Sequence, residues 1–245
     1  MIDFYCISDV GLHRACNQDS YVTCTNNNGD FLALVADGIG GGKAGDVASN
    51  ETVNYIEQHF SSLSFDSLCD AKDKMNVLLN ETNKYVFDLS MSNVDYLGMG
   101  TTLTGILITS FGSLSINVGD SRTYGIVDKK LFRLTSDHTY VNQMLEKGEI
   151  TYKESLTHPK RHYLTRAVGV FDVVEFDIHK VKDMNIYLLC SDGLCGYLQD
   201  NEIMNIVDSL EYDTLKKKGD ALIEKALKKG GYDNVTVVLV SNEDR

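Results

Sequence analysis

Four short apolar runs follow one another closely in the middle of the chain, at residues 102–109, 113–118, 122–127 and 130–134. The gaps between them hold only two or three residues. Such gaps admit a hairpin turn but not the crossover of a dozen or more residues that parallel strands need. We therefore expect antiparallel strands here and interpret the block as one meander.

Further strands and paired helices are predicted on both sides of this block. Strand-like runs lie near residues 2–8, 20–24, 31–36, 173–180, 185–191 and 235–240. Apolar residues recurring every three or four positions predict helices over 43–60, 67–91, 138–147, 200–209 and 213–229. Strand blocks that alternate with helix pairs indicate an α+β protein with antiparallel sheets. Because no shift in composition marks a boundary, we expect a single domain over residues 1–245.

The charge balance limits the possible partners. The chain carries 35 acidic and 23 basic residues, a net charge of −12, which disfavours nucleic-acid binding through a basic surface. An acidic protein is better suited to divalent cations or basic peptides. The N-terminal "MIDFYCISDVG" does not resemble a signal peptide, and no apolar run reaches membrane-spanning length. We expect a cytoplasmic protein.

A glycine-rich loop raises two alternatives. Gly40, Gly42 and Gly45 match the G-x-G-x-x-G pattern of dinucleotide-binding loops. Such loops require an acid about twenty residues on, at the end of a second strand, but that region here continues a predicted helix. A P-loop is also disfavoured, because Lys43 is followed by alanine. Asp37, just before the glycines, favours a metal-binding loop instead.

Five aspartates lie at the ends of the apolar runs. Asp19 starts and Asp37 ends two strands that we expect to form a hairpin, so the two should be neighbours at one sheet edge. Asp192 follows one strand and Asp233 precedes another, and they should also meet if those strands pair antiparallel. Asp120 lies in what we interpret as a tight turn of the meander.

The grouping of these acids favours a metal site over simple turns. A single Asp-Gly is more often a turn than a ligand. Clustered carboxylates, however, repel one another unless protons or cations neutralise them. A ligand set made only of oxygen selects Mg²⁺ or Mn²⁺, and Gly38 would add its backbone carbonyl.

Eight motifs together resemble the metal-dependent serine/threonine protein phosphatases of the protein phosphatase 2C type, in their bacterial branch. They occur in the family's order and span nearly the whole chain: "SDVGLHRACNQDS" (8–20), "VADGIGGGKAGDVAS" (35–49), "GTTLTG" (100–105), "VGDSRTY" (118–124), "LTSDHT" (134–139), "LTRAVG" (164–169), "CSDGLCGYL" (190–198) and "YDNVTVVLV" (232–240). The resemblance implies a four-layer α-β-β-α sandwich, two antiparallel sheets flanked by helix pairs.

The resemblance also implies a set of metal ligands. Asp37 would bridge two tightly bound Mn²⁺ or Mg²⁺ ions, and Gly38 would offer its carbonyl. Asp192 and Asp233 would bind one ion, and Asp19 would act directly or through water.

Further roles carry over to other positions. Asp120, with Asp192, would help to hold a weaker third ion, and Arg14 would grip the substrate phosphate. The polar segment 148–163 would form a flap beside the site. Ile39 stands where many eukaryotic members have a histidine that serves as a general acid, so that group is missing here.

The implied activity is hydrolysis of phosphoserine and phosphothreonine in proteins by a water that two metal ions activate, with Arg14, Asp37 and Asp192 as catalytic residues. The partners would be phosphoproteins, including a cognate serine/threonine kinase, and the protein would be a monomer. Two alternatives stay open: a catalytically silent binding module, and another metal-dependent phosphomonoesterase acting on small molecules. Several other polar residues are interpreted as structural: Thr102, Ser121, Arg122, His138, Arg166 and Asn234.

Overall fold

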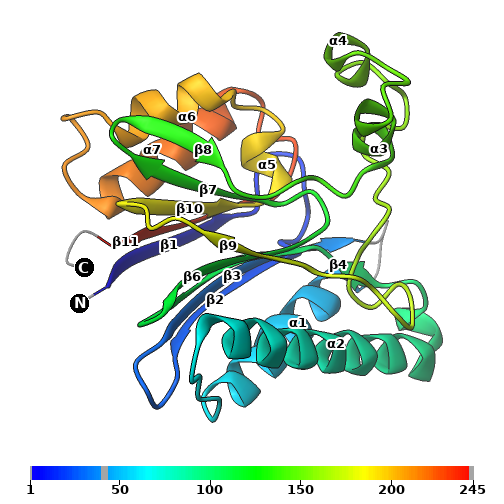
Figure 1. The fold of residues 1–245 in the computed structure, drawn as a ribbon. Coiled ribbons are helices and arrows are strands. Elements are labelled where there is room, and N and C mark those ends of the chain that lie inside the picture. Colours follow the sequence, from blue (N-terminus) through cyan, green and yellow to red (C-terminus); the bar gives the residue numbers. More distant parts are fainter. Residues whose placement is uncertain (1, 40–43, 243–245) are drawn as a thin grey trace.

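The computed structural model describes residues 2–39 and 44–242, so Gly40, Gly42 and Lys43 of the glycine-rich loop lie outside the described residues. Two antiparallel sheets stack face to face (Figure 1). Sheet A has the strand order β1 (Asp3–Asp9), β11 (Val235–Ser241), β10 (Ile186–Cys190), β7 (Arg122–Val127) and β8 (Lys130–Arg133). Sheet B has the order β2 (Asp19–Thr25), β3 (Phe31–Ile39), β5 (Leu103–Thr109), β6 (Gly112–Val118) and β9 (Asp177–Val181), and the short β4 (Gly100–Thr101) also pairs with β3.

Helix pairs cover the outer faces of both sheets (Figure 1). Helices α1 (Gly45–Phe60) and α2 (Leu68–Ser92) pack on sheet B, and α6 (Asp200–Val207) and α7 (Leu215–Lys228) pack on sheet A. The short α5 (Asp192–Cys195) follows β10, and a 3₁₀ turn (Val94–Tyr96) follows α2. The expected four-layer α-β-β-α sandwich is confirmed.

Three apolar layers hold the sandwich together, and they explain why the first six residues of β3, 31–36, are all apolar. Phe31, Ala33 and Val35 face sheet A across the central layer. Leu32 and Leu34 face the opposite way, toward α1 and α2. A strand buried on both faces reads as a continuous apolar run, because neither side meets water.

The predicted meander is wrong at one connection. Strand β6 pairs with β5 and β9 in sheet B, whereas β7 pairs with β8 and β10 in sheet A. The residues between β6 and β7 therefore carry the chain from one sheet to the other. Asp120 lies in this sheet-to-sheet connection and not in a hairpin turn. A three-residue gap is compatible with both arrangements, so local sequence does not distinguish them.

The strand expected near 173–180 begins later, at Asp177. The preceding segment is held by α2 instead of a sheet, because the Asn83 amide donates to the carbonyls of Phe171 and Asp172 at 3.0 and 3.1 Å. Helices α3 (Tyr140–Glu146) and α4 (Tyr152–Ser155) project from one end of the sandwich (Figure 1). Across the described residues, none of the helices combines the length and apolar character needed to cross a bilayer.

Candidate metal centre

The expected pairs of aspartates come together at one end of the two sheets. Asp19 and Asp37 are direct register partners of β2 and β3. Strands β10 and β11 pair antiparallel, so Asp192, just after β10, and Asp233, two residues before β11, lie at the same end of sheet A. Both predicted neighbour relations are confirmed.

Hydrogen bonds join the two pairs across the space between the sheets. One carboxylate oxygen of Asp19, Oδ2, accepts from the hydroxyls of Ser191 and Thr236, both at 2.7 Å. These two residues belong to the Asp192 and Asp233 segments of the other sheet. Sequence reasoning missed them, although Thr236 is a polar residue inside the apolar run "VTVVLV". Asp19 is therefore held by the opposite sheet.

Two glycines allow the backbone to come close at this end. A Cβ built on Gly38 would lie 2.2 Å from the Gly45 carbonyl oxygen, and one on Gly193 would lie 1.9 Å from the Asn234 carbonyl oxygen. Both distances are impossible for a real side chain, so only glycine fits. The close approach at Gly38 packs the start of α1 against the end of β3, and the close approach at Gly193 packs α5 against the Asp233 loop.

Asp37 is anchored through its backbone. Its carbonyl accepts from the Thr102 amide and the Thr101 hydroxyl, both at 2.9 Å, and its amide donates to the Thr102 hydroxyl at 3.0 Å. The Thr102 hydroxyl in turn bonds the Ser121 hydroxyl at 2.8 Å. This confirms the structural interpretation of Thr102 and Ser121, and it connects Asp37 to the segment that carries Asp120.

His138 supports the Asp120 segment from the other side. The Gly119 amide donates to His138 Nδ1 at 3.2 Å, while His138 Nε2 lies 3.1 Å from Asp177. Asp177 also pairs with Arg166 at 2.9 Å. A similar pair, Arg122 with Asp137 at 2.7 Å, lies just after Asp120, so the structural interpretation holds for these basic residues. Sequence reasoning did not identify Asp177 or Asp137 as their partners.

Four of the acids have raised pKa values: Asp19, Asp37, Asp120 and Asp192. Burial is the largest cause for each of these four. For Asp37 the charges of Asp19 and Asp192 add to it, and for Asp192 the charge of Asp120 does so; both pKa values lie well above the usual range. The pKa values of Asp19 and Asp120 rise to about 6. Carboxylates this close share protons or require cations.

The donor set fits hard divalent cations. Asp37 is within hydrogen-bonding reach of both Asp19 and Asp192. The second oxygen of Asp19, Oδ1, is buried and finds no hydrogen-bond partner among the described residues. Within the same residues, no three acidic, histidine or cysteine side chains already converge as a finished metal cage. Asp233 Oδ2 accepts from Arg14, so an ion that binds this oxygen would have to displace Arg14.

Arg14 lies at the rim, as its predicted role requires. Its Nη2 donates to Asp233 Oδ2 at 2.7 Å and its Nε donates to the Tyr232 carbonyl at 3.4 Å. About half of its side chain is exposed, so the guanidinium can turn toward a ligand in solvent.

Asn234 fixes the loop that carries Arg14. Its amide nitrogen donates to the carbonyls of Val10 and Cys16 at 2.9 and 3.0 Å, and its Oδ1 accepts from the Gln18 amide at 2.9 Å. The structural role predicted for Asn234 is therefore confirmed. Its hydrogen bonds tie residues 10–18 to the start of β11.

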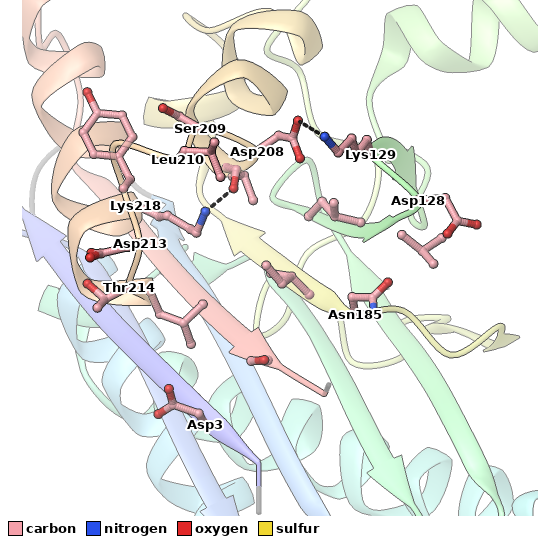
Figure 2. A pocket seen from close by; sticks show the side chains of 17 residues that line it. Asp3, Asp128, Lys129, Asn185, Asp208, Ser209, Leu210, Asp213, Thr214 and Lys218 are labelled. Carbon is pink, nitrogen blue, oxygen red and sulfur yellow. Dashed lines mark hydrogen bonds and ion pairs between the residues drawn. The ribbon is translucent and has the colours of Figure 1, made fainter. Parts of the chain in front are cut away.

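A separate cavity lies at the other end of sheet A. It has a volume of about 610 Å³ and is lined by the far ends of the sheet A strands and by the α6–α7 connection (Figure 2). Figure 2 shows Lys129 beside Asp208, at 4.0 Å, and Lys218 bonded to the Val207 carbonyl. The cavity contains none of the predicted site residues.

Comparison with known proteins agrees with the geometry. Residues 13–241 match the family described as "Protein phosphatase 2C". "Serine/threonine phosphatase stp" of Listeria monocytogenes serotype 4b is 36% identical over 96% of this chain and 94% of that protein. The structure of the S. agalactiae serine/threonine phosphatase has a TM-score of 0.92 at 32% identity and covers 98% of this chain and 99% of that one.

A further structure bears on the metal. The catalytic domain of serine threonine protein phosphatase PstP in complex with 2 manganese ions has a TM-score of 0.83 at 31% identity, over 98% of this chain and 97% of that one. The aspartates thus meet in a chain whose fold, sequence and length all match one metal-dependent family. The protein belongs to the protein phosphatase 2C family.

Proposed function

We propose that this protein hydrolyses phosphoserine and phosphothreonine in other proteins, with divalent cations held between its two sheets. The observation that carries the proposal is the cluster of Asp19, Asp37, Asp192 and Asp233 at one end of the sandwich. Burial, and then the charges of the other acids, raise the pKa of Asp37 well above its usual range. The full chain would act as one catalytic domain and as a monomer. Its substrates would include a cognate serine/threonine kinase.

The ligands we propose are oxygen atoms only. Asp37 would bridge two tightly held Mn²⁺ or Mg²⁺ ions, with Asp192 and Asp233 on one of them. The Gly38 carbonyl and Asp19 Oδ1 would complete the set. When bound, the ions act as Lewis acids and lower the pKa of a water so that it can attack phosphorus at neutral pH.

Asp120 would hold a third ion more weakly. It lies close enough to Asp192 for its charge to raise the pKa of that residue, yet it sits in a connection that carries no second acid of the cluster. Fewer protein oxygens would therefore surround this ion.

The protein's own residues would orient the substrate. Arg14 would leave its contact with Asp233 and donate to the substrate phosphate, since a forked guanidinium matches two phosphoryl oxygens. His138 is not placed to protonate the leaving group, because both of its ring nitrogens are engaged by Gly119 and Asp177. Ile39 offers no proton either.

Phosphopeptide hydrolysis tests the proposal directly. With Mn²⁺ the protein should release phosphate from phosphothreonine peptides, and excess EDTA should abolish the release. Mg²⁺ should restore activity whereas Ca²⁺ should not, because calcium prefers longer bonds and a looser shell. Full activity after confirmed metal removal would contradict the metal mechanism. Faster hydrolysis of nucleotides than of phosphopeptides would instead favour a small-molecule phosphomonoesterase.

A further inference from the structure

Four exposed side chains gather beside the metal centre and form what we call the aromatic ledge: Leu12, His13, Tyr197 and Tyr232. The rings of His13 and Tyr232 stack with centroids 4.9 Å apart and planes at 16°, and Tyr197 lies 5.8 Å from Tyr232. Leu12 is 65% exposed and Tyr232 is 54% exposed. Three neighbouring rings and a leucine thus present apolar surface to solvent at one place.

The ledge is held in place before any ligand arrives. The Leu12 amide donates to the Gly231 carbonyl at 2.7 Å, which joins the two loops that supply three of the four side chains. Asn234 ties the same two loops together through Val10 and Cys16. Tyr197 is carried by the turn after α5, the helix that starts with Asp192. A preformed surface loses little conformational entropy on binding.

The ledge is continuous with the proposed catalytic site. Tyr232 directly precedes Asp233, and its carbonyl accepts from Arg14. Tyr197 stands in the turn after the helix that begins at Asp192, and its ring centroid lies 5.8 Å from that of Tyr232. A peptide whose phosphate is held by Arg14 would therefore have a neighbouring side chain over the ledge, since consecutive residues of an extended chain are about 3.3 Å apart.

The composition of the ledge favours an apolar occupant. Tyrosine faces can bind cations as well as apolar groups. Here one face of Tyr232 is covered by the His13 ring, which stacks on it with centroids 4.9 Å apart, so that face is not open to a cation. Leu12 adds a purely apolar surface.

We propose that the aromatic ledge is a specificity subsite that binds an apolar or aromatic side chain flanking the phosphorylated serine or threonine. This inference rests on the proposed function and names the class of phosphoprotein segment that the site prefers. The step is binding only, because the ledge contributes no group to the hydrolysis.

Matched phosphopeptides test the subsite. Phosphothreonine peptides would differ only in carrying leucine, alanine or lysine at each of the two positions on either side of the phosphothreonine. With Mn²⁺ we expect kcat/KM of the wild-type protein to be about tenfold higher for leucine than for alanine at one or more positions, as is usual for a few methylene groups in an apolar site. Equal values for the two at every position, or a preference for lysine, would overturn the inference.

Variants then locate the preference on the protein. In the double variant Leu12→Ala/Tyr197→Ala the leucine-to-alanine ratio should fall to near one, and the ratio is insensitive to any general loss of activity. Leu210→Ala is the matched control, because Leu210 is 97% exposed at the other end of sheet A; it should keep the wild-type ratio. A ratio that survives in the double variant would show that another surface makes the selection. Failure of the wild-type protein to hydrolyse any phosphopeptide would reject the proposed function itself.

Discussion

The aspartates at the two ends of the sandwich lie in opposite electrostatic environments. At the end where β10 finishes, burial and neighbouring carboxylates raise the pKa values of Asp37 and Asp192. At the other end, beside the cavity of Figure 2, Asp213 pairs with Lys217 at 2.9 Å, and that hydrogen bond lowers the pKa of Asp213. At one end the protein's own lysines neutralise Asp208 and Asp213, whereas the proposed site at the other end would take its cations from solution.

This difference locates function better than the size of a cavity does. The cavity has a volume of about 610 Å³, but two of the aspartates that line it, Asp208 and Asp213, already have lysine partners. The acid cluster brings several negatively charged carboxylates close together, and a bound divalent ion would neutralise their charges. Strongly perturbed pKa values with a stated cause are concentrated at functional sites.

Neutralising one acid at each end should give the largest contrast. We expect Asp37→Asn to reduce phosphopeptide kcat/KM by about a thousandfold, since losing a bridging ligand removes several kcal/mol of metal assistance. The matched variant Asp208→Asn, at the cavity, should stay near wild type. Isothermal titration with Mn²⁺ should show weakened binding only for Asp37→Asn. Comparable losses of kcat/KM in both variants would contradict the difference between the two ends.

Two loop aspartates on either side of β7 offer a closer contrast. Asp120 lies just before the strand and Asp128 just after it. If Asp120 holds an ion that assists departure of the leaving group, Asp120→Asn should lower phosphopeptide turnover by about a hundredfold. Para-nitrophenyl phosphate, whose leaving group needs little protonation, should lose much less, and Asp128→Asn should affect neither substrate. Equal losses of Asp120→Asn on both substrates would reject the leaving-group role.

The basic partners of Asp233 and Asp213, which are Arg14 and Lys217, can be compared by mutation in the same way. Arg14 lies 2.7 Å from Asp233 and Lys217 lies 2.9 Å from Asp213. Arg14→Ala should lower kcat/KM for phosphopeptides by about thirtyfold, the value of a charge-assisted hydrogen bond of about 2 kcal/mol, while Mn²⁺ still binds. Lys217→Ala should leave kcat/KM unchanged. Loss of metal binding in Arg14→Ala would show that Arg14 acts on the ligands and not on the substrate.

The smallest expected effect is on stability without metal. The pKa values of Asp19 and Asp120 are about 6 in the folded protein and about 3.9 in an unfolded chain. The folded state therefore binds more protons between these values, and the free energy of unfolding rises as the pH falls from about 7 toward 4.

A thermal melt without divalent ions should show this trend, with about 2–4 °C in Tm for each kcal/mol gained. Added Mn²⁺ should raise Tm more at pH 7.5 than at pH 5.5, because protons and cations compete for the same oxygens. Asp37→Asn should flatten the dependence, whereas Asp213→Asn should not. A metal-free Tm that climbs steadily with pH in this range would contradict the idea of a repulsive cluster.

Local sequence determined most of the fold. The spacing of apolar residues predicted α2 and β7 to within a residue, because a side chain's face depends only on its own turn or pleat. The Asp19–Asp37 contact followed from the same rule, since a hairpin fixes which residues are opposite. The resemblance to a family added the four-layer arrangement and the proposed ligand set.

Tertiary structure alone decided which sheet each strand joined and what surrounds each acid. The gap between β6 and β7 reads as a hairpin turn, yet the two strands lie in different sheets. Ser191 and Thr236 reach Asp19 from 172 and 217 residues away, and Asp177 orients His138 from 39 residues away. No periodicity spans such separations, because these contacts depend on how the two sheets stack and not on how each strand forms.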